Sequence, residues 1–247
     1  MRFTIKQYHN FGDLSERLKG NLISSVGWDI LLTANEDKDS RLFIPVDRKE
    51  WISKIYKIPE ILARGKRIAK FLADNGFQKI TSVGVGGGYL EYVIKSLLPQ
   101  IYIKCSDFAP QSVKRLRKVF IECEEIDVFD ILNDEWPKQL ENEILMFYRV
   151  DTEFSDLQWK KIFKKMYDSN VLNILFAPNG FLTFKKILVQ KLNQLKALID
   201  RKQTLTFAGY LRTEDTLRSL WEFWYDVKAE FVTENMKCFW LKRKIAN

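Results

Sequence analysis

The sequence predicts an α/β protein with a mostly parallel sheet that carries helices on both faces. Between residues 59 and 177, short β-rich runs alternate with longer helical patterns, which is typical of parallel strands joined by crossover helices. The last two β-rich runs, 227–233 and 237–242, are separated by only three residues, a gap that allows only an antiparallel hairpin. A chain of 247 residues is long enough for one large domain of this kind.

The expected elements follow one another in a regular order. A helix begins at Pro59, a first-turn proline, and ends at Asn75-Gly76. The expected parallel strands are 79–85, 101–106, 122–128, 143–150 and 171–177, and the helices between them are 89–98, 110–119 and 157–167. A long helix at 185–200, an extended run at 204–211 and a helix beginning at Thr213 precede the hairpin. We therefore expect a three-layer αβα architecture with a seven-stranded sheet and an antiparallel C-terminal strand.

The chain divides into a short N-terminal part and one domain. Residues 1–58 show a short helical pattern at 14–23 and a polar stretch at 35–40, so we expect an extension of short helices and loops that acts as a lid. Residues 59–247 are expected to form the ligand-binding domain. Within it, the segment 178–212 is a long insertion whose apolar residues suit the cover of a substrate site.

Composition excludes several classes of protein. With 11 glycines, 6 prolines and 46% hydrophobic residues, the chain is neither collagen-like nor of low complexity. It contains neither a long apolar run nor a signal-peptide pattern, which predicts a cytoplasmic protein without a membrane span. Three widely spaced cysteines and one histidine support neither a disulfide framework nor a metal site. The net charge of +8 favours an anionic partner, although scattered lysines that maintain solubility are an equally good explanation.

The most informative segment is the glycine-rich run 81–89, TSVGVGGGY, after the first expected parallel strand. Glycines between a strand and a helix let the backbone turn sharply and direct the N–H groups of the helix N-terminus at a ligand. A nucleotide-like ligand is therefore expected. The dinucleotide-binding pattern GxGxxG needs a small residue where Tyr89 stands, which disfavours an NAD-dependent enzyme. The pattern is instead GxGxG, formed by Gly84, Gly86 and Gly88.

With this turn the chain resembles the class I S-adenosylmethionine-dependent methyltransferases, whose Rossmann-like domain has a GxGxG turn after its first strand. The resemblance runs from about Phe77 to the C-terminus and includes the closing hairpin. It implies that S-adenosyl-L-methionine is the cofactor and S-adenosyl-L-homocysteine the product. The turn residues that would bind the cofactor are Gly84, Val85, Gly86 and Gly88.

Acids after the next two strands extend the resemblance. Asp107, followed by Phe108, stands where the family binds the two ribose hydroxyls, and a carboxylate accepts two hydrogen bonds from a vicinal diol. A helix N-cap before Pro110 is its alternative role. The resemblance places the adenine contact at Asp127 and Val128. Nearby acids leave other positions open for this contact, namely Glu124, Glu125 and Asp130.

One position departs from the family. Ser82 stands two residues before the first glycine, where the family commonly has an acid that helps to position the methionine end of the cofactor. The contact with the cofactor's amino group is therefore expected to be weaker. This departure motivates the alternative of a non-catalytic, methyltransferase-like binding subunit.

Candidate catalytic residues follow the fourth strand. In-line methyl transfer depends mainly on alignment in a dry pocket, so few side chains are compulsory. Tyr148 is expected to contact the cofactor, Asp151 to act as a base or to bind the acceptor, and Arg149 to hold an anionic acceptor group. His9, the only histidine, is a second candidate base. An exposed loop or surface position is the alternative for Asp151, Arg149 and His9.

The leading hypothesis is O-methylation of a small molecule or glycan. Tyr210 and Arg212, at the far end of the insertion, are expected to contact this substrate. The sequence lacks the [DNS]PP[YF] motif of base and amide N-methyltransferases at the fourth strand, and it lacks a Pro-Cys pair. An RNA methyltransferase is the alternative, because basic residues cluster at 114–118, 160–165 and 185–186.

Overall fold

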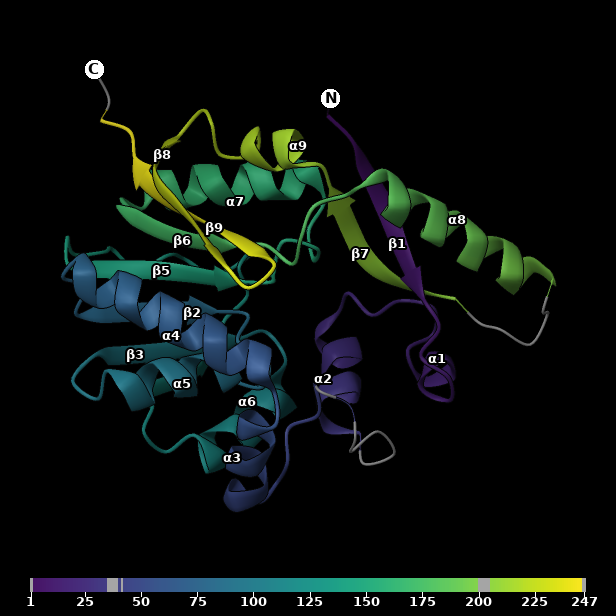
Figure 1. The fold of residues 1–247 in the computed structure, drawn as a ribbon, viewed down its shortest axis with the longest axis horizontal. Helices are drawn as coiled ribbons and strands as arrows, with labels where there is room; N and C mark the ends of the chain where they lie inside the picture. The colour runs from purple at the N-terminus through teal and green to yellow at the C-terminus, as the bar shows by residue number, and fades with distance from the viewer. Residues whose placement is uncertain (1, 35–39, 41, 200–204, 246–247) are drawn as a thin grey trace.

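The central feature of the computed structural model is a seven-stranded sheet (Figure 1), and the structure describes residues 2–34, 40, 42–199 and 205–245. The strand order is β4-β3-β2-β5-β6-β9-β8. The first five strands of this sheet are parallel: β2 (Lys79–Val83), β3 (Tyr102–Asp107), β4 (Glu125–Val128), β5 (Glu143–Tyr148) and β6 (Asn173–Ala177). The hairpin of β8 (Tyr225–Thr233) and β9 (Met236–Arg243) adds an antiparallel edge. The expected mostly parallel sheet with an antiparallel C-terminal strand is confirmed.

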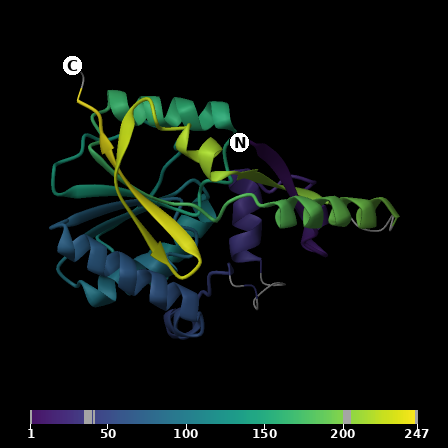
Figure 2. The same cartoon turned by 45° about the horizontal axis from the view of Figure 1, so that its top comes forward.

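Helices cover both faces of this sheet (Figure 2). One face packs against α4 (Pro59–Asp74), α5 (Tyr89–Leu97) and α6 (Pro110–Val119), and the other against α7 (Asp156–Asp168) and α9 (Glu214–Arg218). Alternate strand residues point to opposite faces, so Ile144 joins the first core and Leu145 the second. Each face therefore has its own hydrophobic core, which gives the three-layer architecture.

The N-terminal part contains a strand that the sequence did not predict. β1 (Thr4–His9) pairs antiparallel with β7 (Thr206–Arg212) in a separate two-stranded sheet, and Thr4 lies opposite Arg212. The short run TIKQYH has a weak apolar pattern, and its partner lies near the other end of the sequence, so local periodicity does not reveal the pairing. The helices α1 (Leu14–Arg17), α2 (Ser25–Thr33) and α3 (Arg48–Tyr56) follow it.

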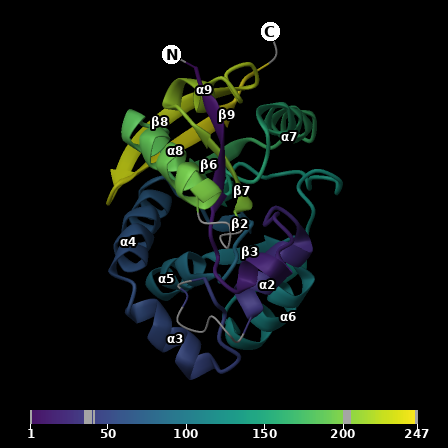
Figure 3. The same ribbon diagram turned by 90° about the vertical axis from the view of Figure 1, so that its right-hand side faces the viewer.

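In the insertion after β6, the strand lies at the carboxyl ends of the parallel strands, and the helix does not. The helix α8 (Phe184–Ile199) extends beyond the sheet beside β1 (Figure 3). Phe184 is 83% exposed and Leu188 is 53% exposed, so these side chains cover no cavity. The strand β7 runs back across the carboxyl ends of the parallel strands instead. None of the helices that the structure describes is long and apolar enough to cross a membrane.

Candidate active site

The glycine turn between β2 and α5 has a backbone that only glycine adopts easily. Gly84, Gly86 and Gly88 have φ values of 71°, 52° and 65°, all in the left-handed region. A Cβ atom on Gly84 would lie 2.6 Å from Cγ2 of Val150, in the loop after β5. The turn therefore needs glycine both for its conformation and for the close approach of the neighbouring loop.

Asp107, the last residue of β3, fixes this turn. Its Oδ2 atom accepts a hydrogen bond of 2.9 Å from the backbone N–H of Gly86, and its Oδ1 atom accepts one of 3.0 Å from Ala109. Burial raises the pKa of Asp107, although these backbone N–H groups favour the charged form. Asp29 of α2, not Asp107, accepts hydrogen bonds from the first turn of α6, at 2.8 Å from the backbone nitrogen of Ser112.

Two cavities open at the carboxyl ends of the parallel strands, with volumes of about 350 and 510 Å³. Their shared lining residues are Trp28, Leu32, Gly84, Gly86, Arg149 and Glu153. The two cavities therefore meet at the glycine turn. Because the strand order reverses between β2 and β5, this is the position where open α/β sheets bind ligands.

The first cavity is rich in aromatic side chains. The rings that line it are Trp28, Phe108, Phe129, Phe154, Phe207 and Tyr210. Asp107 lies in the same lining. A planar heterocycle with an attached diol fits a site that combines ring faces with a buried carboxylate such as Asp107.

The second cavity carries charged side chains of both signs. Arg64, on α4, donates a hydrogen bond of 2.8 Å to the hydroxyl of Tyr148, and its buried Nε atom has no hydrogen-bond partner among the described residues. Glu91, in the first turn of α5, accepts a hydrogen bond of 2.7 Å from the hydroxyl of Ser82. Burial raises the pKa of Glu91 to about 7. This cavity therefore offers partners for a carboxylate and for an ammonium group.

Glu153 is the titratable side chain common to both cavities besides Arg149. Its Oε2 atom accepts a hydrogen bond of 2.7 Å from the indole Nε1 of Trp28, and the hydroxyl of Thr152 donates one of 3.2 Å to its Oε1 atom. Burial raises the pKa of Glu153 to about 8. A carboxylate with this pKa is suited to accept a proton near neutral pH. The sequence placed candidates in the run 148–153 but did not select this residue.

Asp151, the expected base, lines neither cavity. The side chain is 3% exposed, and its Oδ1 atom accepts a hydrogen bond of 2.6 Å from the backbone N–H of Asn179. Burial raises the pKa of Asp151 to about 6. Arg149 has a φ of 62°, so the backbone bends at this residue. The alternation of side chains along an extended strand therefore ends here and does not predict whether Asp151 or Glu153 faces the cavities.

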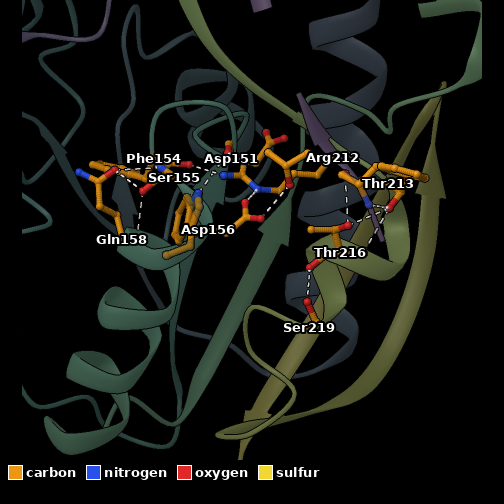
Figure 4. A network of polar contacts seen from close by, with 12 residues as sticks. Asp151, Phe154, Ser155, Asp156, Gln158, Arg212, Thr213, Thr216 and Ser219 are labelled. Atoms are coloured by element: carbon orange, nitrogen blue, oxygen red, sulfur yellow. Dashed lines mark hydrogen bonds and ion pairs between the residues drawn. The ribbon is translucent and has the colours of Figure 1, made fainter. Parts of the chain in front are cut away.

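Arg212, expected to contact the substrate, is also placed elsewhere (Figure 4). The side chain is 2% exposed and lines neither cavity. Its Nε atom donates a hydrogen bond of 2.7 Å to Oδ1 of Asp156, and its other nitrogens donate to the carbonyls of Asp151 and Phe154. Arg212 therefore holds the loop after β5 in place, while Tyr210 of the same strand lines the first cavity.

The expected adenine contacts lie outside the cavities as well. Asp127 forms ion pairs of 3.1 Å with Lys104 and Arg117, and Val128 is 49% exposed. The first cavity is lined instead by the next four residues, 129–132. The side chain of Asp130, one of the alternatives, accepts a hydrogen bond of 2.9 Å from the backbone N–H of Leu132. The lining of the cavity by this loop therefore begins at Phe129, one residue after the expected contacts.

The remaining expected residues divide between the cavities and their surroundings. Val85, Tyr148 and His9 line the second cavity, and Phe108 lines the first. Arg149 lines both, and its Nε atom donates a hydrogen bond of 2.8 Å to Oδ1 of Asn179. Gly88 is the N-cap residue of α5 and lines neither cavity. In the part of the chain that the structure describes, no group of three or more His, Cys, Asp and Glu side chains is placed to hold a metal ion.

The chain has the class I methyltransferase fold, which it shares with several solved structures. Magnesium protoporphyrin IX methyltransferase (ChlM) from Synechocystis PCC 6803, solved with bound SAH, aligns with 89% of this chain and 99% of its own, with a TM-score of 0.59 and 11% identity. The PH0226 protein from Pyrococcus horikoshii OT3 aligns with 86% of this chain and 100% of its own, with a TM-score of 0.56 and 14% identity.

A third relative is longer than this chain. The mitomycin 7-O-methyltransferase MmcR aligns with 74% of this chain, with a TM-score of 0.55 and 14% identity, and the chain spans only 54% of its length. No protein-family model matches the chain, and no curated protein matches it in sequence. The likeness at these identities establishes the fold.

Proposed function

We propose that this protein is an S-adenosylmethionine-dependent methyltransferase that methylates a hydroxyl group of a small molecule or glycan. One observation carries the proposal: the backbone N–H of Gly86 is bound to the carboxylate of Asp107, 2.9 Å away, beside a cavity at the switch point of the sheet. This contact brings a glycine backbone and a buried acid to the lining of the same cavity. An adenosyl group needs both features, a close backbone approach and an acceptor for two hydroxyls.

The two cavities suit the two ends of this cofactor. The first would hold the adenosyl group, with Asp107 at the ribose and the rings of Phe108 and Phe129 at the base. The second would hold the amino-acid end, where the unpartnered Nε of Arg64 fits a carboxylate. When bound, S-adenosylmethionine supplies a methyl group on a positively charged sulfur, which is an activated donor.

Glu153 takes the role of base in this proposal, in place of Asp151. Its position at the meeting of the two cavities puts its carboxylate beside the point where donor and acceptor would meet. The hydrogen bond from Trp28 fixes its orientation. Glu153 would accept the proton of the acceptor hydroxyl as that oxygen attacks the methyl group, and the rings around it would exclude water.

The arrangement of basic residues favours a small acceptor over RNA. The clusters at 114–118 and 160–165 lie on α6 and α7, on opposite faces of the sheet, so they form no common surface. Several of their cations also bind the protein itself: Arg115 donates to the carbonyl of Ile44, and Lys165 to that of Leu132. A nucleic-acid surface needs basic groups that converge and are free for phosphates.

Calorimetric titration with S-adenosylhomocysteine tests the proposal, with NAD as the comparison ligand. We expect binding of the first and none of the second. Transfer of labelled methyl from S-adenosylmethionine to a panel of phenols and sugars then tests the activity. Binding of the product without transfer to any acceptor would favour the non-catalytic subunit, and the absence of binding would reject the proposal.

A further inference from the structure

We propose that Glu91 binds the α-ammonium group of the cofactor, in place of the acid that the family commonly carries at the position of Ser82. This inference rests on the proposed function and adds a specific partner to the amino-acid end of the ligand. Ser82 has no charge of its own, so the contact would be lost unless another residue supplies a carboxylate. The structure supplies one from the helix that follows the turn.

The geometry ties the two residues together. Ser82 is the fourth residue of β2 and Glu91 lies in the first turn of α5, with the glycine turn between them. The hydroxyl of Ser82 donates a hydrogen bond of 2.7 Å to Oε1 of Glu91, and both side chains are 1% exposed. The glutamate lines the second cavity together with Val85 and Gly87. Ser82 therefore orients a carboxylate at the turn that it cannot provide itself.

The carboxylate of Glu91 has no cationic partner among the described residues. No lysine, arginine or histidine forms an ion pair with it among the residues that the structure describes. The charged group that influences its titration is Asp107, whose negative charge opposes a second one, and the buried thiol of Cys105 nearby is neutral because burial raises its pKa. A buried carboxylate without a cation is costly. A ligand that brings an ammonium group into this cavity would remove that cost.

The positions of the surrounding charges agree with this orientation of the ligand. Arg64 lies in the same cavity and fits the α-carboxylate, whereas Glu91 fits the α-ammonium. Glu60, Arg149 and Glu153 also line this cavity. The pair of Glu91 and Arg64 is sufficient to match both charges of an amino acid. In this chain the acid lies on the helix after the turn, whereas the family commonly has it on the strand before the turn. The negative charge would therefore lie at the turn in both cases.

Three ligands separate an ammonium contact from a structural role. Calorimetry of the wild type and of Glu91→Gln would use S-adenosylhomocysteine, its deaminated analogue, and 5′-methylthioadenosine, which lacks the amino-acid end. We expect Glu91→Gln to weaken S-adenosylhomocysteine by about 10- to 100-fold and to leave the other two unchanged. Equal weakening of all three ligands, or no weakening of any, would overturn the inference.

A second variant, in which the acid and the hydroxyl exchange positions, provides a test that does not depend on Glu91→Gln alone. In the variant Ser82→Asp/Glu91→Ser, the acid returns to the strand and the hydroxyl moves to the helix. We expect it to regain the preference for S-adenosylhomocysteine over the deaminated analogue that Glu91→Gln loses, with circular dichroism confirming the fold of each variant. If the folded exchange variant has no such preference, Glu91 is not a transferable ammonium site. If the wild type itself binds no S-adenosylhomocysteine, the proposed function fails first.

Discussion

The indole nitrogen of Trp28 donates a hydrogen bond of 2.7 Å to Oε2 of Glu153, and so joins α2 to the loop after β5. The next residue, Asp29, accepts hydrogen bonds from the first turn of α6, 2.8 Å from the nitrogen of Ser112. Two adjacent side chains of the N-terminal part thus contact both sides of the site. The lid proposed for residues 1–58 would act through this contact, because Trp28 lines both cavities.

Replacing Glu153 by glutamine removes the proposed base and keeps an acceptor for Trp28. We expect kcat to fall by about 10²- to 10⁴-fold, with the Kd for S-adenosylhomocysteine nearly unchanged. Glu135→Gln, at an exposed position, is the matched control and should keep full activity. A Glu153→Gln enzyme with wild-type kcat would remove this residue from the mechanism.

The pH profile gives a separate test of the same carboxyl. Burial raises the pKa of Glu153 to about 8, and only the deprotonated form accepts a proton. The rate of the wild type should therefore rise from about pH 6, reach half its maximum near pH 8 and level off above about pH 9. The same rise should be missing in Glu153→Gln. A rate that is independent of pH in the wild type over this range argues for another base or for none.

Asp107→Asn tests whether the Asp107 carboxylate binds the ribose hydroxyls. The amide keeps one oxygen that accepts a hydrogen bond but loses the charge that strengthens the bonds to a diol. We expect S-adenosylhomocysteine to bind about 10- to 100-fold more weakly. Calorimetry measures this directly, and Asp127→Asn, outside the cavities, serves as the control with unchanged affinity. Equal affinity of Asp107→Asn and the wild type would mean that the ribose does not bind at the end of β3.

Arg212→Met should lower stability and leave recognition of the acceptor intact. The substitution removes the donors to the carbonyls of Asp151 and Phe154 and leaves Asp156 without its partner. We expect the free energy of unfolding to fall by about 3 kcal/mol, measured with denaturant. Unchanged stability with a raised KM for the acceptor would instead assign Arg212 to the substrate, as the sequence predicted.

Glu91→Gln should change how stability depends on pH. The carboxyl of Glu91 has a pKa of about 7 in the folded chain, above its usual 4.5. The unfolded chain therefore loses this proton at a lower pH than the folded chain does. The wild type therefore loses stability as pH rises from about 4.5 to 7, by up to about 3 kcal/mol. Melting temperatures should show Glu91→Gln to be the more stable protein at pH 8, with the difference vanishing near pH 4.5. Parallel curves for the two proteins would mean that the carboxyl is not desolvated.

The sequence predicted what local patterns determine. The alternation of β-rich and helical runs indicated the parallel sheet, and the short gap at 234–236, which is a two-residue turn in the structure, indicated the antiparallel edge. The glycine turn and Asp107 lie directly after strands, where the direction of the chain is fixed by the sheet. These are the parts of the site that one segment can specify.

The features that the sequence did not predict depend on contacts between distant segments. The pairing of β1 with β7 brings together Thr4 and Arg212, and no local period marks it. The choice among the acids after β5 depends on the positive φ of Arg149 and on the indole of Trp28, which lies 125 residues away from Glu153. The sequence predicted that Arg212 contacts the substrate, but the loop carbonyls that bind it come close only in the folded chain.

The central claim is that the glycine turn and Asp107 bind an adenosyl group whose sulfur faces Glu153. A crystal structure with S-adenosylhomocysteine tests this claim most directly. The account predicts both ribose hydroxyls within hydrogen-bond distance of the Asp107 carboxylate, and the sulfur at the meeting of the two cavities. Density for the ligand at any other place on the protein, or a ribose held by other residues, would contradict it.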